Sequence, residues 1–325
     1  MKIKLTEFQR QLCNLLQAGL PVCARPFEAV AAMVNSDEET VLQEVRRLMD
    51  CRLIRRFSVL VNYRATGAAG TLATAHVPQE YLPAVIDAVN SIEGVSHNYL
   101  RQHHYNLWFT LQAESPGRID KILSDLSVRF GMDFKSLPVE RTFKLDVRFD
   151  AEDRGQVLLR DVDEIPEEKP VELDKIQKEI LVSLQGGLEI VPGPFDFLCG
   201  GGLKLSRVLQ IIKELIDKKV IRRIAAIVDH RMLGFTANVL FACEVSQDRV
   251  TQIGSKLAEV GIVSHCYQRK TVKDWPYNLF AMMHSRSMGE IQQVVNDFVG
   301  AEGVTSFELL PTAAELKKQP ARYKF

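Results

Sequence analysis

Residues 263–284 read VSHCYQRKTVKDWPYNLFAMMH, and this stretch decides the fold because the chain contains it twice. The earlier copy, residues 95–111, reads VSHNYLRQHHYNLWFTL and keeps the Val-Ser-His start, the spaced Tyr and Arg, and the Tyr-Asn-Leu before an apolar run. The two copies hold five of the seven histidines: His97, His103, His104, His265 and His284. Because histidine titrates near neutral pH and binds metals, this concentration indicates a site rather than packing alone.

The duplication extends beyond these hairpins. The segment Ile54-Arg55-Arg56-Phe57 recurs as Ile221-Arg222-Arg223-Ile224, and Val61-Asn62-Tyr63-Arg64 recurs as Val228-Asp229-His230-Arg231. The period is about half of the chain, which indicates a tandem duplication rather than a solenoid of short repeats.

Each half opens with a helical region. A first helix is predicted from apolar residues on one helical face: Leu5, Phe8, Leu12, Leu15 and Leu16. A capping box at residues 36–39, Ser-Asp-Glu-Glu, precedes a further helix, and an extended segment begins at Ile54. Helices followed by a strand pair form a winged helix-turn-helix, and residues 173–221 are expected to repeat it.

The rest of each half alternates strands and helices. In the first half we predict strands at 68–77, 95–102, 105–114 and 136–145, and helices at 80–92 and 117–130. The second half follows the same order through 235–246, 249–260, 263–270, 277–285, 288–299 and 304–310. The order β-α-β-β-α-β is that of the ferredoxin-like fold, and the quoted hairpin is its second and third strands.

The predicted fold class is therefore α+β, a tandem repeat of a winged helix-turn-helix and a ferredoxin-like βαββαβ domain. The predicted boundaries are 1–64 for the first winged helix-turn-helix, 65–146 for the first ferredoxin-like domain, 147–171 for an acidic linker, 172–232 for the second winged helix-turn-helix and 233–325 for the second ferredoxin-like domain. The linker is expected to have no core of its own.

Composition narrows the possible functions. The formal net charge is zero, which argues against DNA binding because phosphate contacts need a basic surplus. No signal-peptide layout and no membrane-spanning apolar run is present, and the six cysteines form no C-x-x-C pair. We expect a cytoplasmic protein with reduced thiols, no membrane contact and no zinc or iron–sulfur site.

Several motifs point to one family. The most specific is Asp274-Trp275-Pro276-Tyr277-Asn278-Leu279-Phe280, which follows Ser264-His265-Cys266-Tyr267 and Arg269. Others are Arg25-Pro26-Phe27, Asp229-His230-Arg231-Met232-Leu233-Gly234, and the end of the chain from Leu310-Pro311-Thr312 through Lys317-Lys318 to Tyr323. With the helix-turn-helix and ferredoxin-like order, these motifs resemble a divergent branch of the Lrp/AsnC family, the siroheme decarboxylases. Members are two different subunits or a fusion of both, and this chain resembles the fusion.

The resemblance implies an enzyme that removes CO2 from two acetate side chains of siroheme. The product would be 12,18-didecarboxysiroheme, an intermediate for haem or haem d1. No cofactor beyond the iron of this substrate is expected. The two halves are expected to form a pseudo-heterodimer, with a further homodimer possible. Because Asn62-Tyr63 replaces the Asp-His of the second half, we expect the halves to be unequal, with one productive pocket.

A flat macrocycle fringed by carboxylates needs an apolar slot, cations at its rim and a proton donor. The candidate catalytic residues are His265, His103, His97, His104 and His230. The candidate substrate-binding residues are Arg101, Arg269, Tyr99, Tyr267, Trp275, Lys270 and Arg231. His265 or His103 is the candidate axial ligand of the siroheme iron.

Each candidate has a structural alternative. His97 and His265 could be hydrogen-bonded strand residues, His103 and His104 a solvated turn, and His230 a turn cap. His284 and His76 are expected to be structural, and the arginine pairs that begin at Arg55 and Arg222 to be solvated wing charges.

Two other functions remain open from the sequence. The first is a DNA-binding regulator of the Lrp/AsnC type, against which Asp37, Glu38 and Glu39 stand at the start of the expected recognition helix. The second is a haem sensor or carrier that uses the same pocket without turnover.

Overall fold

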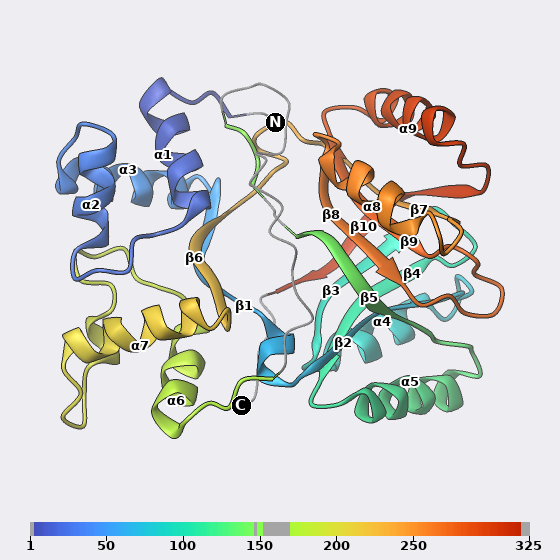
Figure 1. Cartoon of the computed structure of the whole chain (residues 1–325), viewed down its shortest axis with the longest axis horizontal. Coiled ribbons are helices and arrows are strands. Elements are labelled where there is room, and N and C mark those ends of the chain that lie inside the picture. Colours follow the sequence, from blue (N-terminus) through green and yellow to red (C-terminus); the bar gives the residue numbers. More distant parts are fainter. Residues whose placement is uncertain (1–2, 146–147, 152–169, 320–325) are drawn as a thin grey trace.

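The computed structural model describes residues 3–145, 148–151 and 170–319, and these form two layers (Figure 1). One layer is helical and holds the start of each half. The other is a sheet structure flanked by helices and holds the remainder of each half. The segments of residues 152–169 and 320–325, which include much of the predicted acidic linker and the terminal Tyr323 motif, lie outside the described residues.

The helical layer begins with three helices: α1 (Glu7–Ala18), α2 (Pro26–Met33) and α3 (Glu38–Asp50). Thr6 and Gln9 form a capping box at α1. The predicted box at residues 36–39 is a single cap instead, because the Asp37 side chain accepts a hydrogen bond from the Thr40 amide. A cap of this kind satisfies one of the free amides of the first helical turn.

The second half departs from this layout. It has α6 (Lys175–Leu184) and α7 (Leu205–Asp217), but only a one-turn 3-10 helix, η2 (Asp196–Leu198), between them. The prediction that the second half repeats the first is therefore wrong at the middle helix. Pro194 before η2 and the triple glycine that begins at Gly200 leave too short a segment for an α-helix.

The predicted strand pair of each wing is also wrong. Each half supplies one strand, β1 (Ile54–Val61) and β6 (Ile221–Val228), and these pair antiparallel with each other, Phe57 opposite Ala226. The chain after β1 turns into a short helix, η1 (Tyr63–Thr66), so β1 has no hairpin partner in its own half. Buried residues of both helical regions consequently form one shared core.

Eight strands form a closed barrel in the second layer. The first half supplies β2 (Ala69–Ala75), β3 (Val95–Arg101), β4 (Leu107–Ala113) and β5 (Lys135–Leu145), and the second half supplies β7 (Ala237–Cys243), β8 (Val263–Arg269), β9 (Leu279–Ser285) and β10 (Phe307–Lys318). Their order is β10-β3-β4-β2-β5-β8-β9-β7. Each half keeps the predicted ferredoxin-like order, with α4 (Leu82–Ser91), α5 (Pro116–Phe130), α8 (Val250–Glu259) and α9 (Met288–Glu302) outside the barrel (Figure 1).

Two long strands close the barrel. In β5, residues 135–138 pair with β2 and residues 139–145 pair with β8. In β10, residues 307–311 pair with β7 and residues 312–318 pair with β3. The predicted end of the last strand at residue 310 is therefore wrong, because its continuation is stabilised by a strand of the other half that local sequence does not reveal.

The start of the predicted linker packs into the core of the helical layer, so the prediction that the linker has no core is wrong there. Phe149 is 2% exposed and belongs to the core of the helical layer. Its backbone exchanges two hydrogen bonds of 2.9 Å with the Gln17 side chain, and the Ala151 amide donates to Asn14. Residues 149–151 are thus held against α1.

Candidate functional site

The repeated hairpins line the inside of the barrel. Side chains alternate across a strand, and Asn98 of β3 points outward, since its side chain donates to Asn90 of α4. His97, Tyr99 and Arg101 therefore face inward. On β8 the same positions are His265, Tyr267 and Arg269, and the Arg269 guanidinium donates to the Leu137 carbonyl of the inner core.

The two copies present their histidines at the same end of the barrel. Neighbouring strands are antiparallel at each of the four pairings that separate β3 from β8. After four reversals β3 and β8 run in the same direction, so His97 and His265 both lie near the start of their strands. We refer to this end as the barrel mouth, which comprises His97, His265, His284 and His230.

His284 and His230 complete the mouth from two further elements. His284 lies at the end of β9 and His230 in the turn after β6, with ring centroids 5.0 Å apart. Phe149 lies 5.1 Å from both rings and stacks on His230. The mouth is therefore the place where the barrel meets the helical layer.

Burial keeps three of the mouth imidazoles, those of His97, His230 and His284, neutral. Desolvation, with help from Lys318, lowers the pKa of His97 to about 4 and that of His230 to about 3. Burial lowers the pKa of His284 well below its ordinary value, and the neighbouring His230 and His265 lower it further. An anionic ligand at the mouth would oppose this effect, because negative charge favours the imidazolium.

Two buried arginines lie deeper in the barrel. Arg101 donates 2.7 Å to the Leu310 carbonyl and Arg269 donates 2.8 Å to the Leu137 carbonyl, while the Nε of each has no hydrogen-bond partner among the described residues. Burial lowers the pKa of both guanidinium groups to about 10. No ion pair to a described carboxylate neutralises either charge. An anion that enters the barrel can therefore bind to these two cations.

Tyrosines cover these cations. The guanidinium of Arg101 lies 5.4 Å from the centre of the Tyr99 ring, and that of Arg269 lies 5.0 Å from the Tyr267 ring. Burial raises the pKa of both phenols to about 12, so they remain neutral donors at physiological pH. The predicted grouping of Tyr99, Tyr267, Arg101 and Arg269 is thus present inside one barrel.

An ionic cluster adjoins the mouth on the β3 side. Asp229 pairs with Arg55 at 2.6 Å, and Glu315 of β10 lies 3.5 Å from Lys318, 3.8 Å from Arg55 and 3.9 Å from Arg231. The prediction that Arg55 is a solvated wing charge is therefore wrong, because its side chain is 26% exposed and paired. Arg231, a predicted substrate-binding residue, does lie beside the mouth.

Four candidates lie at the opposite end of the barrel, so the single site expected from the sequence does not form. Six residues of extended chain separate His97 from His103, a span of about 20 Å. His103 instead packs against Trp275, with ring centroids 5.5 Å apart, and its Nδ1 accepts the Tyr105 amide. The remaining two are His104, which stacks 4.1 Å from His76, and Lys270, whose amide donates to the Pro138 carbonyl.

Trp275 closes that far end. It is 2% exposed and belongs to an apolar cluster with Trp108 and Phe280 inside the barrel. The β8–β9 connection therefore folds its tryptophan inward, which leaves the mouth as the polar end of the barrel.

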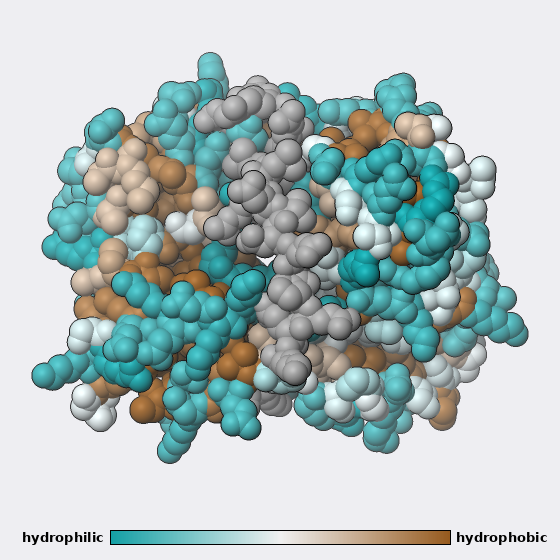
Figure 2. Space-filling model, in the orientation of Figure 1, coloured by the Kyte–Doolittle hydropathy of each residue, from teal (hydrophilic) through white to brown (hydrophobic). Residues whose placement is uncertain are grey.

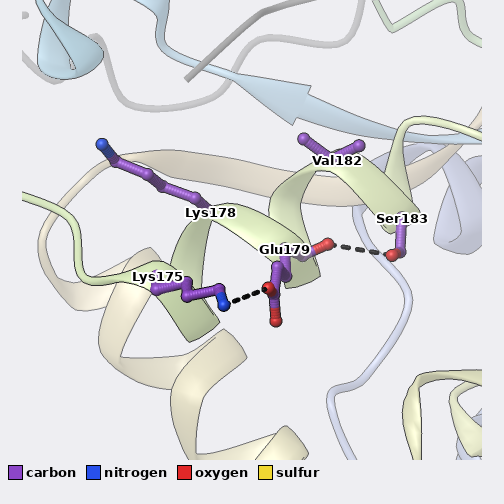
Figure 3. A pocket seen from close by; sticks show the side chains of 5 residues that line it. All are labelled: Lys175, Lys178, Glu179, Val182 and Ser183. Atoms are coloured by element: carbon purple, nitrogen blue, oxygen red, sulfur yellow. Dashed lines mark hydrogen bonds and ion pairs between the residues drawn. The ribbon is translucent and has the colours of Figure 1, made fainter.

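Two surface hollows lie away from the mouth, and no mouth histidine lines either of them. A cavity of about 590 Å³ lies along α6, where Lys175, Lys178, Glu179, Val182 and Ser183 line it (Figure 3). A second one, of about 240 Å³, includes Tyr63 and Arg64 beside β2 and β5. The space-filling view shows mixed polar and apolar residues over both layers (Figure 2). Neither hollow lies at the mouth, where the two halves come together.

Sequence reasoning missed three residues of the mouth region. His284 was assigned a structural role, and Glu315 and Lys318 lay beyond the predicted end of β10. Only the strand pairing between the halves, which has no local signal, brings the last two beside His97. Across the described ranges, no group of three or more His, Cys, Asp or Glu side chains could hold a metal, and no helix is long and apolar enough to cross a membrane.

Comparisons with known proteins agree with this architecture. A model of the AsnC-like ligand binding domain matches residues 65–144 and 232–317, and a model of the siroheme decarboxylase NirDL-like HTH domain matches residues 9–55. The curated siroheme decarboxylase of Hydrogenobacter thermophilus is 30% identical over 320 residues, which cover 98% of this chain and 95% of that protein. The siroheme decarboxylase NirDL subunit of Paracoccus denitrificans is 32% identical over 293 residues, covering 88% and 87%.

A solved structure shows the same arrangement. The crystal structure of the siroheme decarboxylase NirDL superposes with a TM-score of 0.75 at 27% identity and covers 98% of this chain and 94% of that one. A second crystal structure, of NirDL in co-complex with an iron-uroporphyrin III analogue, gives 0.73 over the same coverage. The fold of this chain is therefore similar to that of NirDL along nearly its whole length.

Proposed function

The chain belongs to the siroheme decarboxylase family, and from this premise we propose that it removes CO2 from two acetate side chains of siroheme to give 12,18-didecarboxysiroheme. It would act as a carbon–carbon lyase in haem or haem d1 biosynthesis. The observation that carries the proposal is the mouth itself, where Lys318 lies near His97 of the first half and near His230 and His284 of the second half, with two arginines buried in the barrel.

The binding step follows from the charges of the site. Siroheme is a flat apolar ring with a fringe of carboxylates. Arg101 and Arg269 inside the barrel and Arg231 at its rim can each bind a carboxylate in bidentate fashion. The ring would lie against Phe149 and the imidazoles, and it would exclude water from the barrel. The iron comes with the substrate and needs no resident cofactor, and His265 is the candidate axial ligand on this side of the barrel.

The reaction needs a proton donor at the mouth. The bond between the acetate methylene and its carboxyl group breaks, CO2 leaves, and the electron pair stays on the methylene carbon, where the macrocycle delocalises it. An imidazolium then transfers its proton to that carbon, which becomes a methyl group. The substrate's own carboxylates raise the pKa of the nearby imidazoles, so His97 or His265 can hold this proton once substrate is bound.

The assembly proposed here is a pseudo-heterodimer within one chain. The alpha subunit of siroheme decarboxylase from Desulfovibrio desulfuricans is 37% identical over 140 residues, which cover 43% of this chain and 81% of that subunit. A fusion of two such subunits accounts for the β1–β6 pairing and the shared barrel.

The test is anaerobic incubation of the purified chain with siroheme, followed by mass spectrometry. Loss of two CO2 units per macrocycle is expected. Unchanged siroheme that remains tightly bound would overturn the proposal in favour of a carrier or sensor.

DNA binding is tested separately by gel shift at physiological salt. The Asp37 carboxylate caps α3 and Glu38 pairs with Arg25, so the end of α3 that would meet phosphates is acidic. No shift is expected with random duplex DNA, and a specific shift would favour the regulator.

A further inference from the structure

A line of polar side chains runs inside the barrel from the arginine level to the mouth. Arg101 Nη1 lies 3.2 Å from Thr312 Oγ1, and Thr312 Oγ1 lies 3.0 Å from Asn238 Oδ1. The Asn238 amide nitrogen Nδ2 then lies 3.4 Å from His284 Nδ1. The line therefore connects a buried cation to a mouth histidine through two neutral residues.

The hydrogen bonds of this line run in one direction. A guanidinium can only donate, so Thr312 Oγ1 accepts from Arg101, and the Thr312 hydroxyl donates to Asn238 Oδ1. Asn238 must then present its Nδ2 to His284, and an amide NH2 can only donate. His284 Nδ1 is consequently the acceptor, and the neutral ring carries its hydrogen on Nε2.

The other half of the chain has no such line. Residues equivalent by strand register are Gly70 for Asn238, Val139 for Thr312 and Gln112 for His284. Gly70 and Val139 have no side-chain hydrogen-bonding group, and Gln112 is not a histidine, so these residues cannot form the same hydrogen bonds to an imidazole. Because this line of hydrogen bonds is present in only one of two similar halves, the barrel fold does not depend on it.

We propose that Thr312 and Asn238 are positioning residues that hold His284 as a neutral Nε2–H donor toward a carboxylate of the substrate. This role deepens the proposed function and rests on it. His284 then orients the carboxylate, and proton transfer to carbon is left to another imidazole. Burial of His284, which lowers its pKa well below the ordinary value, is consistent with a ring that stays neutral.

Nitrogen-15 NMR of histidine-labelled full-length protein at neutral pH tests the tautomer without any substrate. The His284 signals are assigned by their loss in His284→Gln, and an Nε2-protonated ring is expected. In Asn238→Asp the new carboxylate can only accept, so the ring should switch to the Nδ1-protonated form. In Thr312→Val the amide can flip, so a mixture is expected, whereas Thr312→Ser should restore the wild-type signals.

Activity provides the second readout. We expect kcat to fall about 10- to 100-fold in Asn238→Asp and in Thr312→Val. In Thr312→Ser, which keeps the hydroxyl group, kcat should equal the wild-type value. An Nδ1-protonated His284 in the wild type, or changed tautomers with unchanged kcat, would overturn the inference while leaving the decarboxylase proposal intact. If the tautomers behave as expected but the wild type leaves siroheme unchanged, the decarboxylase proposal fails and the tautomer assignment stands.

Discussion

The β3 side and the β8 side of the barrel mouth come from the same duplicated hairpin, yet they carry different charges. Lys318 pairs in register with His97, whereas Leu145 pairs with His265. In the same way Glu315 lies opposite Tyr99, and the equivalent partner of Tyr267 is Thr142. The repeated strands thus supply the same frame twice. The neighbouring strand carries Glu315 and Lys318 on the β3 side and uncharged residues at the equivalent positions on the β8 side.

The turns beside the mouth differ as well. The β3 side is met by Asp229 and His230, and the β8 side by Asn62 and Tyr63. Tyr63 packs against Gly70, where a Cβ would lie 2.8 Å from the ring. One copy therefore has an imidazole at this position, and the other has a phenol that packs against a glycine. The two sides therefore present different side chains to a ligand, and four experiments test whether they have separate tasks.

The largest effect is expected at the mouth histidines. Proton donation by a positioned side chain contributes about 100- to 10,000-fold, so replacing the donor should reduce kcat by that order. His97→Ala and His265→Ala, compared in the siroheme assay, should differ strongly if only one is the donor. Equal losses would contradict a division of tasks. His103→Ala, which the sequence alone predicted to be damaging, is expected to leave kcat unchanged because His103 lies at the far end.

A smaller effect is expected at the buried arginines. Arg101→Gln and Arg269→Gln each remove a charge-assisted hydrogen bond to a substrate carboxylate, worth about 1.5–3 kcal/mol, which corresponds to a KM increase of roughly tenfold or more. Circular dichroism would show whether each fold survives. Unchanged KM in both variants would mean that the cations serve the barrel alone.

The pH dependence of stability should come mainly from the β3 side. His230 has a folded pKa of about 3, below its ordinary value, so it stabilises the fold above pH 6.5 and this contribution is lost as pH falls toward 3. The free energy of unfolding should be lower at pH 5 than at pH 7 by an amount on the order of 1 kcal/mol per buried histidine, and the midpoint of thermal unfolding should fall with it. His230→Asn should reduce this difference, and an unaltered pH profile would count against the buried neutral ring.

The smallest effect is expected from exchanging the charges between the two sides. Glu315→Gln removes a partly exposed carboxylate that lies near Lys318, Arg55 and Arg231. The loss of these ion pairs changes the interaction free energy by about 0.2–1 kcal/mol, and the three freed cations should lower KM slightly. Thr142→Glu places a carboxylate at the equivalent position on the β8 side and should raise KM. Steady-state kinetics at low and high salt measure both, and an unchanged KM in both variants would mean that charge at these positions does not act on the substrate.

Much of this could be read from the sequence because it depends on local pattern. The repeat of Val-Ser-His-x-Tyr-x-Arg predicted two equivalent strands, and the βαββαβ order of both halves is confirmed. The apolar periodicity predicted α1 and α3 within a few residues. The predicted site residues stay a prediction: the structure places His265 and His230 near His284, whereas His103 packs against Trp275 at the other end of the barrel.

The errors share one cause, which is pairing between distant segments. The sequence of each wing predicts a hairpin, but the backbone of β1 forms its strand hydrogen bonds with β6. Likewise β10 continues past residue 310 only because β3 offers an open edge. Unpaired strand edges are satisfied by whichever strand the tertiary fold brings near, and a single sequence does not specify that choice.

Three features followed from the order of residues alone: the duplicated frame, the alternation that turns His97 and Tyr99 to one face, and the family to which the chain belongs. Contacts between distant segments were needed to show that the two sheets close into one barrel, that the mouth and the hairpin turns lie at opposite ends, and that Asn238 lies beside His284. The physical reason is that side-chain direction follows from the local period of a strand, whereas proximity depends on which distant strands exchange hydrogen bonds.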